Sequence, residues 1–167
     1  MIVYKDGDIL TSTADAICHQ VNCRGVMGAG LAKQIKQKYP TVFAFYKARC
    51  DEDARTRKIS GISKSGLLGL AQVCYKENYR VGEVKDKQMI VNLFAQDGYG
   101  IDRQYTDYDA LRVCLKNLSW LLSGRATTIA IPYQMGCGLG GGDWDIVLSI
   151  IEEALASYTV EIWKHNK

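Results

Sequence analysis

Two glycine-rich segments constrain the fold of this chain more than any other feature of its sequence. Gly25, Gly28 and Gly30 stand close together between an apolar run and a helix-like run, and "QMGCGLGGG" at 134–142 has the same setting. Glycine loses much conformational freedom when it is held in place, so such a cluster indicates a backbone that passes close to something. A strand, a glycine loop and a helix therefore follow one another twice, which predicts alternating α and β elements.

Strands and helices alternate along most of the sequence. Hydrophobic periodicity predicts strands at 1–5, 14–22, 70–78, 87–96, 127–132 and 159–163. The same analysis predicts helices at 31–39, 42–54, 106–124 and 143–158. The third and fourth strands follow one another directly, with 79–86 as a hairpin-like connection. This order predicts one domain over 1–167, an α/β fold of three layers, α/β/α, with a mixed central sheet.

The helices carry more detailed expectations. Thr106 and Asp109 resemble a capping box at the start of the third helix. The apolar stripe of that helix is predicted to be Leu111, Leu115, Leu118 and Leu122. One face of the last helix is predicted to hold Ile146, Ile150 and Ala154. Residues 51–69 are polar and contain glycine, so we expect a loop there, with "ARTRK" at 54–58 in solvent.

Composition excludes several classes of protein. The formal net charge is +3, too mild for a dedicated nucleic-acid binder with a dense basic stripe. Six cysteines are scattered, several of them in apolar runs, which indicates reduced thiols and a cytoplasmic location. We see no signal peptide after Met1, and no apolar run reaches membrane-spanning length, so no membrane contact is expected.

Each glycine loop leads into a helix N-terminus, where free N–H groups and a partial positive charge favour anions. Ligands of open α/β sheets bind at the carboxyl ends of strands, so two neighbouring loops would grip an extended anion such as a diphosphate. The alternative is that the glycines only make tight strand-to-helix turns. The loop at 25–30 lacks the Gly-Lys-Ser/Thr sequence of ATP-type phosphate loops.

Three other kinds of site match parts of the sequence less well. "GCGLGG" at 136–141, with Glu161 about twenty residues later, matches a dinucleotide fingerprint, but too little chain follows for a second βαβαβ half. Cys18, His19 and Cys23 lack the spacing of a zinc site, and core thiols beside a polar histidine explain them better. Cys137 and His19 remain open as a nucleophile pair, although no third orienting residue is evident.

With both loops placed, the sequence resembles the macro domains, α/β/α modules that bind ADP-ribose. The resemblance spans nearly the whole chain. It is carried by "GDI" at 7–9, "HQVNCRGVMGAGLA" at 19–32, "NLFAQ" at 92–96 and "IPYQMGCGLGGGDW" at 131–144. It implies that the first loop wraps the distal ribose and a phosphate, while the second loop cradles the diphosphate. A side chain at Gly138 or Gly140 is then expected to crowd the phosphate.

The resemblance also implies roles for individual residues. Asp8 would accept a hydrogen bond from the adenine amino group, with Ile9 beside it, unless Asp8 only serves the turn after the first strand. Asn22 would bind the distal ribose, its alternative being to cap the loop backbone. Trp163 and His165 would flank the base, although a terminal histidine is often only solvated. The implied ligand-binding set is Asp8, Ile9, Asn22, Gly25, Val26, Met27, Gly28, Ala29, Gly30, Gln96, Gly136, Cys137, Gly138, Leu139, Gly140, Gly141 and His165.

Within this family the chain resembles the branch of ADP-ribose 1''-phosphate phosphatases and terminal ADP-ribose glycohydrolases. The pattern H-x-x-N-C-x-G that starts at His19 resembles the phosphatases and implies a catalytic histidine, the alternative being a structural one. The glycohydrolase lysine after the central strand is missing, and Gly140 stands where that group has aspartate. Asp143 is a weaker catalytic candidate, since an aspartate there also suits a helix cap.

The sequence therefore favours a hydrolase of an ADP-ribose derivative, either the 1''-phosphate or an ADP-ribosyl adduct. A non-catalytic module that reads ADP-ribose is the alternative. The expected ligand is ADP-ribose or a derivative, with ADP-ribosylated protein or nucleic acid as candidate partners. We expect neither a metal ion nor a cofactor.

Overall fold

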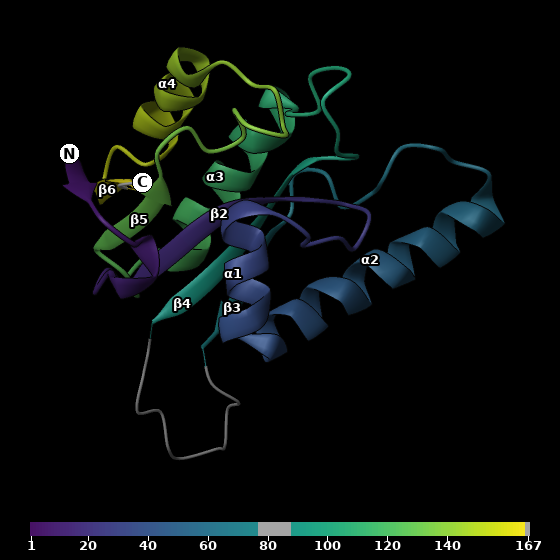
Figure 1. Ribbon diagram of the computed structural model, residues 1–167, viewed down its shortest axis with the longest axis horizontal. Coiled ribbons are helices and arrows are strands. Elements are labelled where there is room, and N and C mark those ends of the chain that lie inside the picture. Colours follow the sequence, from purple (N-terminus) through teal and green to yellow (C-terminus); the bar gives the residue numbers. More distant parts are fainter. Residues whose placement is uncertain (77–87, 166–167) are drawn as a thin grey trace.

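The protein is seen in a computed structural model, which describes residues 1–76 and 88–165. The predicted connection at 79–86 lies outside these residues. Six strands form one sheet: β1 (Ile2–Asp6), β2 (Ala16–Asn22), β3 (Ala71–Tyr75), β4 (Met89–Gln96), β5 (Thr128–Pro132) and β6 (Thr159–Lys164). The helices are η1 (Ile9–Thr11), α1 (Gly30–Lys38), α2 (Pro40–Ser60), α3 (Tyr108–Leu122) and α4 (Trp144–Ala154). The predicted mixed α/β fold is confirmed (Figure 1).

The strand order is β1-β6-β5-β2-β4-β3, and each neighbouring pair is parallel except β3 with β4. The carboxyl ends of five strands therefore lie along one edge of the sheet. Because β2 and β5 are neighbours, the two glycine loops start side by side at that edge. The order of strands thus brings together two segments that are more than a hundred residues apart in the sequence.

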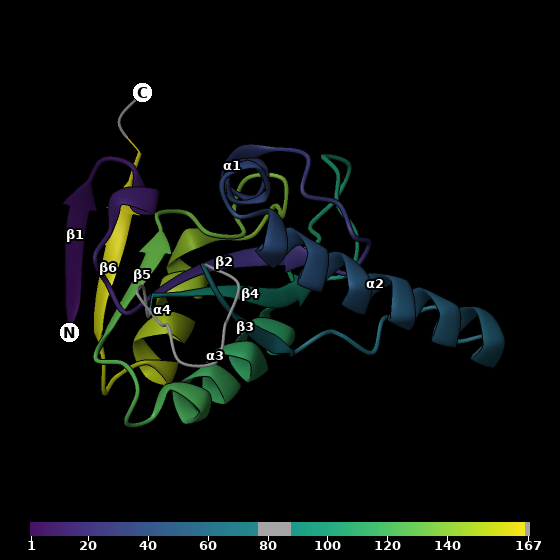
Figure 2. The ribbon, with the colours of Figure 1, turned by 90° about the horizontal axis from the view of Figure 1, so that it is seen from below.

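Helices cover both faces of the sheet, α1 and α2 on one and α3 and α4 on the other (Figure 2). The leucine stripe of α3 is buried as predicted, against Val147, Ile150 and Ile151 of α4. On the opposite face Ile35 of α1 and Val42 of α2 are fully buried. Burying one such side chain stabilises the fold by about 1.5–3 kcal/mol, so these two faces fix the helices against the sheet.

The loop predicted at 51–69 is wrong in its first half, because α2 continues to Ser60. Segment 54–58 is consequently helical, although mostly exposed. Oppositely charged side chains one turn apart support this length, with Arg57 bound to Asp53 and Arg49 to Glu52. The polar composition that suggested a loop is the outer surface of a long helix.

Two expectations for the later helices are also corrected. Asp107, not Thr106, caps α3, because its side chain accepts a hydrogen bond from the Ala110 N–H. The buried face of α4 centres on Val147 and Ile151 beside Ile150, while Ile146 is exposed. This helix also ends at Ala154, four residues early. None of the described helices is both long enough and apolar enough to cross a membrane.

Candidate functional site

The first glycine loop ends at a helix N-terminus that no side chain caps. Ala29 is the N-cap residue of α1 and has extended backbone angles, but its methyl group accepts no hydrogen bond. Within the described part of the chain, the N–H groups of Gly30, Leu31 and Ala32 have no protein acceptor. Free N–H groups at the positive end of a helix dipole form an anion site.

Asn22, at the end of β2, holds the first loop in shape. Its Oδ1 accepts hydrogen bonds from the Arg24 N–H at 2.9 Å and the Tyr46 hydroxyl at 2.8 Å, and its Nδ2 donates to the Val26 carbonyl at 2.7 Å. The structure therefore shows the loop-capping alternative for Asn22. An amide nitrogen carries two hydrogens, so one remains for a ligand.

The other predicted residues of the first loop differ in exposure. Gly28, Ala29 and Gly30 are exposed, and Val26 is exposed at the outer edge of the loop. Met27 points into the core beside Tyr46, and it is almost completely buried. Met27 is thus a core residue of the loop, and the exposed positions around it are Val26, Gly28, Ala29 and Gly30.

The second loop is held together by its own backbone. The Gly136 carbonyl accepts hydrogen bonds from the Gly142 N–H and the Thr106 hydroxyl, and the Gly140 carbonyl accepts from the N–H groups of Tyr105 and Thr106. Among the described residues, the N–H groups of Gly138, Leu139 and Gly140 reach no protein acceptor. This loop therefore offers free donors of its own.

Its glycines have different surroundings. A Cβ at Gly140 would lie 2.4 Å from the Thr106 hydroxyl and 2.5 Å from the Gly136 carbonyl oxygen, whereas a Cβ at Gly138 would meet nothing within 4 Å. The expectation that a side chain at Gly140 would crowd a phosphate is corrected, since it would instead strike the protein. Gly138 is the position open to a ligand.

The half-buried side chain of Gln20 supports the second loop from below. Gln20 donates from Nε2 to Gln96 Oε1 and to the Thr106 hydroxyl, both at 2.8 Å. Gln96 in turn donates to the Gly98 carbonyl. A Cβ at Gly136, whose φ is +75°, would lie 2.6 Å from Gln20 Oε1. Gln96, predicted as a ligand contact, is therefore buried and is bonded to Gln20 and to the Gly98 carbonyl within the protein.

The helix after the second loop is capped. Asp143 Oδ1 accepts hydrogen bonds from the N–H groups of Asp145 and Ile146 at the start of α4. Asp145 adds a second carboxylate in the first turn. The geometry matches the capping alternative for Asp143, and it leaves this helix end unsuited to an anion.

The far end of the site lies at β1 and β6. Asp8 Oδ1 accepts from the Leu10 N–H at 2.9 Å and caps the short helix η1, so the carboxylate serves the turn, with Oδ2 left over. Ile9 is buried beneath it. Trp163 lies beside Gly7 and donates to Glu161, and His165 is exposed. Glu161 is thus an internal acceptor on β6.

His19 lies inside the sheet. Its side chain is 2% exposed, and Nε2 is 2.6 Å from Asn92 Oδ1. Burial lowers the pKa of His19 to about 4, although the Asn92 hydrogen bond acts the other way, so the ring is neutral near pH 7. Cys137 is half-buried against the Met135 carbonyl, and burial raises its pKa to about 11. Each residue of the suggested nucleophile pair thus has a different partner, and the geometry favours a structural His19.

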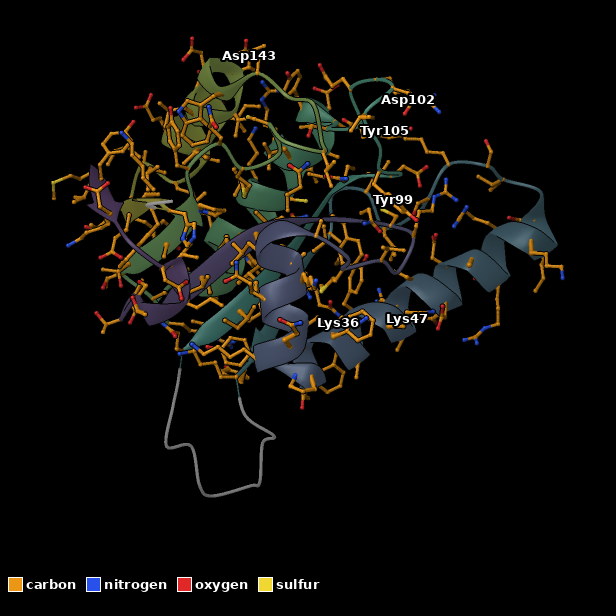
Figure 3. The ribbon with its side chains drawn as sticks, viewed as in Figure 1. Lys36, Lys47, Tyr99, Asp102, Tyr105 and Asp143 are labelled. Carbon is orange, nitrogen blue, oxygen red and sulfur yellow. The ribbon has the colours of Figure 1, made fainter. Side chains whose placement is uncertain are left out.

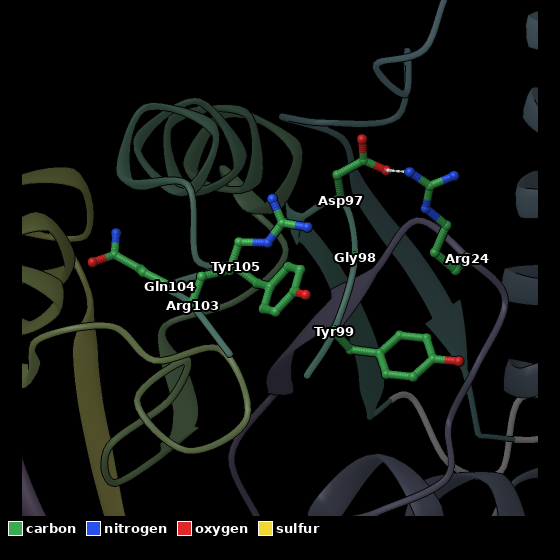
Figure 4. A pocket seen from close by; sticks show the side chains of 7 residues that line it. All are labelled: Arg24, Asp97, Gly98, Tyr99, Arg103, Gln104 and Tyr105. Carbon is green, nitrogen blue, oxygen red and sulfur yellow. Dashed lines mark ion pairs between the residues drawn. The ribbon is translucent and has the colours of Figure 1, made fainter. Parts of the chain in front are cut away.

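A pocket of about 470 Å³, which the sequence analysis did not single out, opens beside the two loops (Figure 4). Arg24 lies on one side, and the other lining residues are Asp97, Gly98, Tyr99, Arg103, Gln104 and Tyr105. Tyr99 and Tyr105 line it, and Asp102 lies next to Tyr105, away from Asp143 at the start of α4 (Figure 3). The one available signal was the pair of tyrosines in the glycine-containing loop "DGYGIDRQY".

Sheet order, helices on both faces and two adjacent glycine loops define an α/β/α domain with an anion-binding edge. No protein-family model matches the chain. It is 30% identical over 190 residues to the ADP-ribose 1''-phosphate phosphatase of Aspergillus clavatus, covering 95% of this chain and 92% of that protein. It is 28% identical over 147 residues to the DNA ADP-ribosyl glycohydrolase of Mycobacterium tuberculosis, covering 88% of this chain but only 36% of that protein.

Solved structures agree with these relatives. The macrodomain of Mycobacterium tuberculosis DarG superposes with a TM-score of 0.73 at 25% identity, over 100% of this chain and 99% of that one. The macrodomain of Thermus aquaticus DarG superposes with a TM-score of 0.69 at 25% identity, over 100% of this chain and 99% of that chain. The chain belongs to the macrodomain family, and the fold inferred from its resemblance is confirmed.

Proposed function

We propose that this protein binds ADP-ribose between its two glycine loops and hydrolyses a bond to the distal ribose. The observation that carries the proposal is that two sets of free N–H groups lie at the ends of adjacent parallel strands. One set is on the first turn of α1, and the other is on the second loop. A diphosphate lying across the edge would accept from both sets. Relatives named as a phosphatase and as glycohydrolases of ADP-ribose derivatives support the same ligand.

The remaining ligand is assigned by position. Asp8 Oδ2 at the end of β1 accepts from the adenine amino group, and the free hydrogen of Asn22 Nδ2 donates to a hydroxyl of the distal ribose. Leu139 and Cys137 flank the diphosphate, and Gly138 lies against it. Residues 1–167 act as one domain in a reducing compartment, which agrees with six free thiols.

A non-catalytic reader is the second candidate, and specific observations favour it. No lysine occurs between Lys87 and Lys116, Gly140 replaces the aspartate of the glycohydrolases, and His19 is held inside the sheet. If the protein does hydrolyse its ligand, the missing lysine means that water attacks the distal ribose and that no covalent lysine adduct forms. Incubation with ADP-ribose 1''-phosphate, ADP-ribosylated DNA and ADP-ribosylated protein separates the two candidates, because a reader consumes none of them.

Binding itself is tested by calorimetry with ADP-ribose on the wild type, Gly138→Glu and the matched control Gly138→Ala. The glutamate carboxylate would repel the diphosphate and fill its space, so we expect at least a hundredfold loss of affinity, or about 2.7 kcal/mol. Since a Cβ at Gly138 meets open space, both variants should keep the circular dichroism of the wild type. Normal binding by a folded Gly138→Glu protein would contradict the proposed cradle.

A further inference from the structure

Asp97 begins the loop that leaves β4, at the same edge of the sheet as the two glycine loops. Its neighbour Gln96 is the last residue of β4 and lies opposite Asn22, the last residue of β2. The Cys23 N–H, one residue beyond Asn22, donates to the Asp97 carbonyl at 3.0 Å. Neighbouring strands are about 4.8 Å apart, so the backbone of Asp97 lies within one strand spacing of the first loop. Asp97 therefore lies beside the place proposed for the distal ribose.

The carboxylate of Asp97 lines the pocket and has few partners. The Arg24 guanidinium forms an ion pair with its Oδ1 at 3.0 Å (Figure 4), and 27% of the side chain is exposed. Among the described residues, Oδ1 accepts no hydrogen bond, and Oδ2 accepts one, from the Ser65 N–H at 3.4 Å. An ionised carboxylate has about four acceptor positions, so most of those of Asp97 are unused. Asp97 can therefore still accept a proton from a molecule bound beside it.

Asp53 on α2 is a carboxylate with a structural role in the same region. It accepts hydrogen bonds from the Ser65 hydroxyl at 2.8 Å and the Gly66 N–H at 2.9 Å. The Arg57 guanidinium donates to it at 2.7 Å. Both carboxylates thus bind Ser65, but Asp53 is held by three short hydrogen bonds and Asp97 by a single long one. This contrast indicates that Asp97 has capacity left for chemistry, whereas Asp53 only fixes the chain.

The other acid–base candidates of the site are engaged elsewhere. His19 is buried within the sheet, and Asp143 caps α4. Asp8 caps η1 beyond β1, which lies three strands away from β2 in the sheet. Among the described residues, Asp97 is the carboxylate that lines the pocket. Since the chain lacks the lysine expected after the central strand, a water that attacks the ribose needs a base, and Asp97 is placed to be that base.

We infer that Asp97 is the general base of the proposed hydrolysis and accepts a proton from the water that attacks the anomeric carbon of the distal ribose. The inference rests on the proposed function and assigns its reacting carboxylate. The water oxygen forms a bond to the anomeric carbon, and the bond from that carbon to its substituent breaks, with the electron pair leaving on the substituent. One water proton passes to Asp97 and from there to the solvent, which regenerates the carboxylate. Arg24 is a positioning residue, because its ion pair holds the carboxylate and offsets its repulsion of the diphosphate.

The test uses whichever of ADP-ribose 1''-phosphate, ADP-ribosylated DNA and ADP-ribosylated protein the wild type consumes. A general base contributes roughly a hundredfold to ten-thousandfold, so Asp97→Asn should lower kcat by that factor. Asparagine keeps the size of the side chain, so the Kd for ADP-ribose, measured by calorimetry, should change less than about threefold. The matched control Asp53→Asn alters the other carboxylate to which Ser65 donates. It should lower Tm and leave kcat within about threefold of the wild type.

Chemical rescue separates a base from a structural carboxylate. Asp97→Ala opens a space beside Arg24 that formate, a small carboxylate, fills. We expect formate to raise kcat of Asp97→Ala at least about tenfold and to leave the wild type and Asp53→Asn unchanged.

Two kinds of result would overturn the inference while ADP-ribose binding and turnover by the wild type stand. One is a wild-type kcat in Asp97→Asn. The other is a structural role for Asp97, shown by a folded Asp97→Ala protein that stays inactive in formate, or by loss of the circular dichroism of the folded protein in both variants. If the wild type binds ADP-ribose but consumes none of the three substrates, the proposed hydrolysis fails together with the inference, and only the proposed binding remains.

Discussion

The two glycine loops look alike in the sequence but are built differently. Side chains organise the first loop: Asn22 holds its backbone from the end of β2, and Tyr46 of α2 donates to the Asn22 side chain from below. The second loop is organised by its own carbonyls, those of Gly136 and Gly140, which accept hydrogen bonds across the loop and from Thr106. One loop thus depends on its neighbours and the other on the absence of side chains within it.

The helices that follow differ in the same way. The first turn of α1 has no side-chain cap at Ala29, so its N–H groups are available to a ligand. The first turn of α4 is satisfied by the carboxylate of Asp143. The pattern of a strand, a glycine loop and a helix therefore predicts where a ligand binds, but it does not predict which N–H groups donate to the ligand. In the first case the helix end donates, and in the second the loop itself does.

The strongest test of this difference is Gly140→Ala. The new methyl group would overlap the Thr106 hydroxyl and the Gly136 carbonyl, so we expect the free energy of unfolding to fall by about 3 kcal/mol or more. Gly138→Ala is the matched control in the same loop, and it should cost less than about 1 kcal/mol because its Cβ meets open space. Urea unfolding of both variants measures the difference. Equal costs would show that the second loop does not depend on close packing at Gly140.

His19 on β2, the strand that leads into the first loop, should make the free energy of unfolding depend on pH. Its pKa is about 4 when folded and about 6.5 when unfolded, so the unfolded state binds more protons between these values. Stability is fully present above pH 6.5 and is lost as pH falls toward 4, by up to about 3 kcal/mol. Carboxylates with a lowered pKa, such as Asp53, also stabilise the fold less in acid. The quantity to compare is therefore the difference in the free energy of unfolding between the wild type and His19→Gln.

Urea unfolding at several pH values gives this difference. The contribution of His19 is the part of the pH dependence that His19→Gln lacks between pH 6.5 and 4. Identical profiles for the two proteins would show that His19 is protonated as easily in the folded state as in the unfolded chain. Retained turnover by His19→Gln on any ADP-ribose derivative would further support its structural role.

Tyr46→Phe tests the support of the first loop from below. It removes a hydroxyl that donates to Asn22, so unfolding should become easier by about 1–2 kcal/mol and affinity for ADP-ribose should fall. Tyr158→Phe is the matched control, because it removes a similar hydrogen bond to Ser119 far from both loops. We expect it to cost similar stability and leave affinity unchanged. Equal affinities of the two variants would separate loop support from ligand binding.

The sequence predicted the fold better than the details of the site. Alternating apolar strands and amphipathic helices determine the layers, and the leucine stripe of α3 was placed correctly, because burial periodicity is a local property of the sequence. The capping of the loop by Asn22 was among the alternatives, because its bonds to Arg24 and Val26 are local, whereas the support of Asn22 by Tyr46, 24 residues away, was not predicted. The choice between a catalytic and a structural His19 stayed open, and the pocket at Tyr99 was not predicted, for the same reason: both depend on neighbours that only the folded sheet supplies.

The last prediction exchanges the caps of the two helices. Removing the α4 cap in Asp143→Ala should lower stability by about 1 kcal/mol, while Asp143→Asn, which keeps an acceptor oxygen, should cost only a few tenths. Neither change should abolish turnover if Asp143 is a cap and not a catalytic carboxylate. Thermal unfolding and the three-substrate incubation measure the two properties separately.

The reciprocal change, Ala29→Asp, supplies α1 with the cap that it lacks. Its extended backbone angles suit an N-cap, so the aspartate should accept from the first-turn N–H groups and raise stability by about 0.5–1 kcal/mol. The same carboxylate would occupy the donors that an anionic ligand needs and would repel it, so affinity for ADP-ribose should fall as stability rises. Opposite signs of the two effects would locate the anion site at the helix end of the first loop. A more stable protein that binds ADP-ribose as tightly as before would show that the α1 N-terminus takes no part, and the two loops would then bind their ligand in the same way.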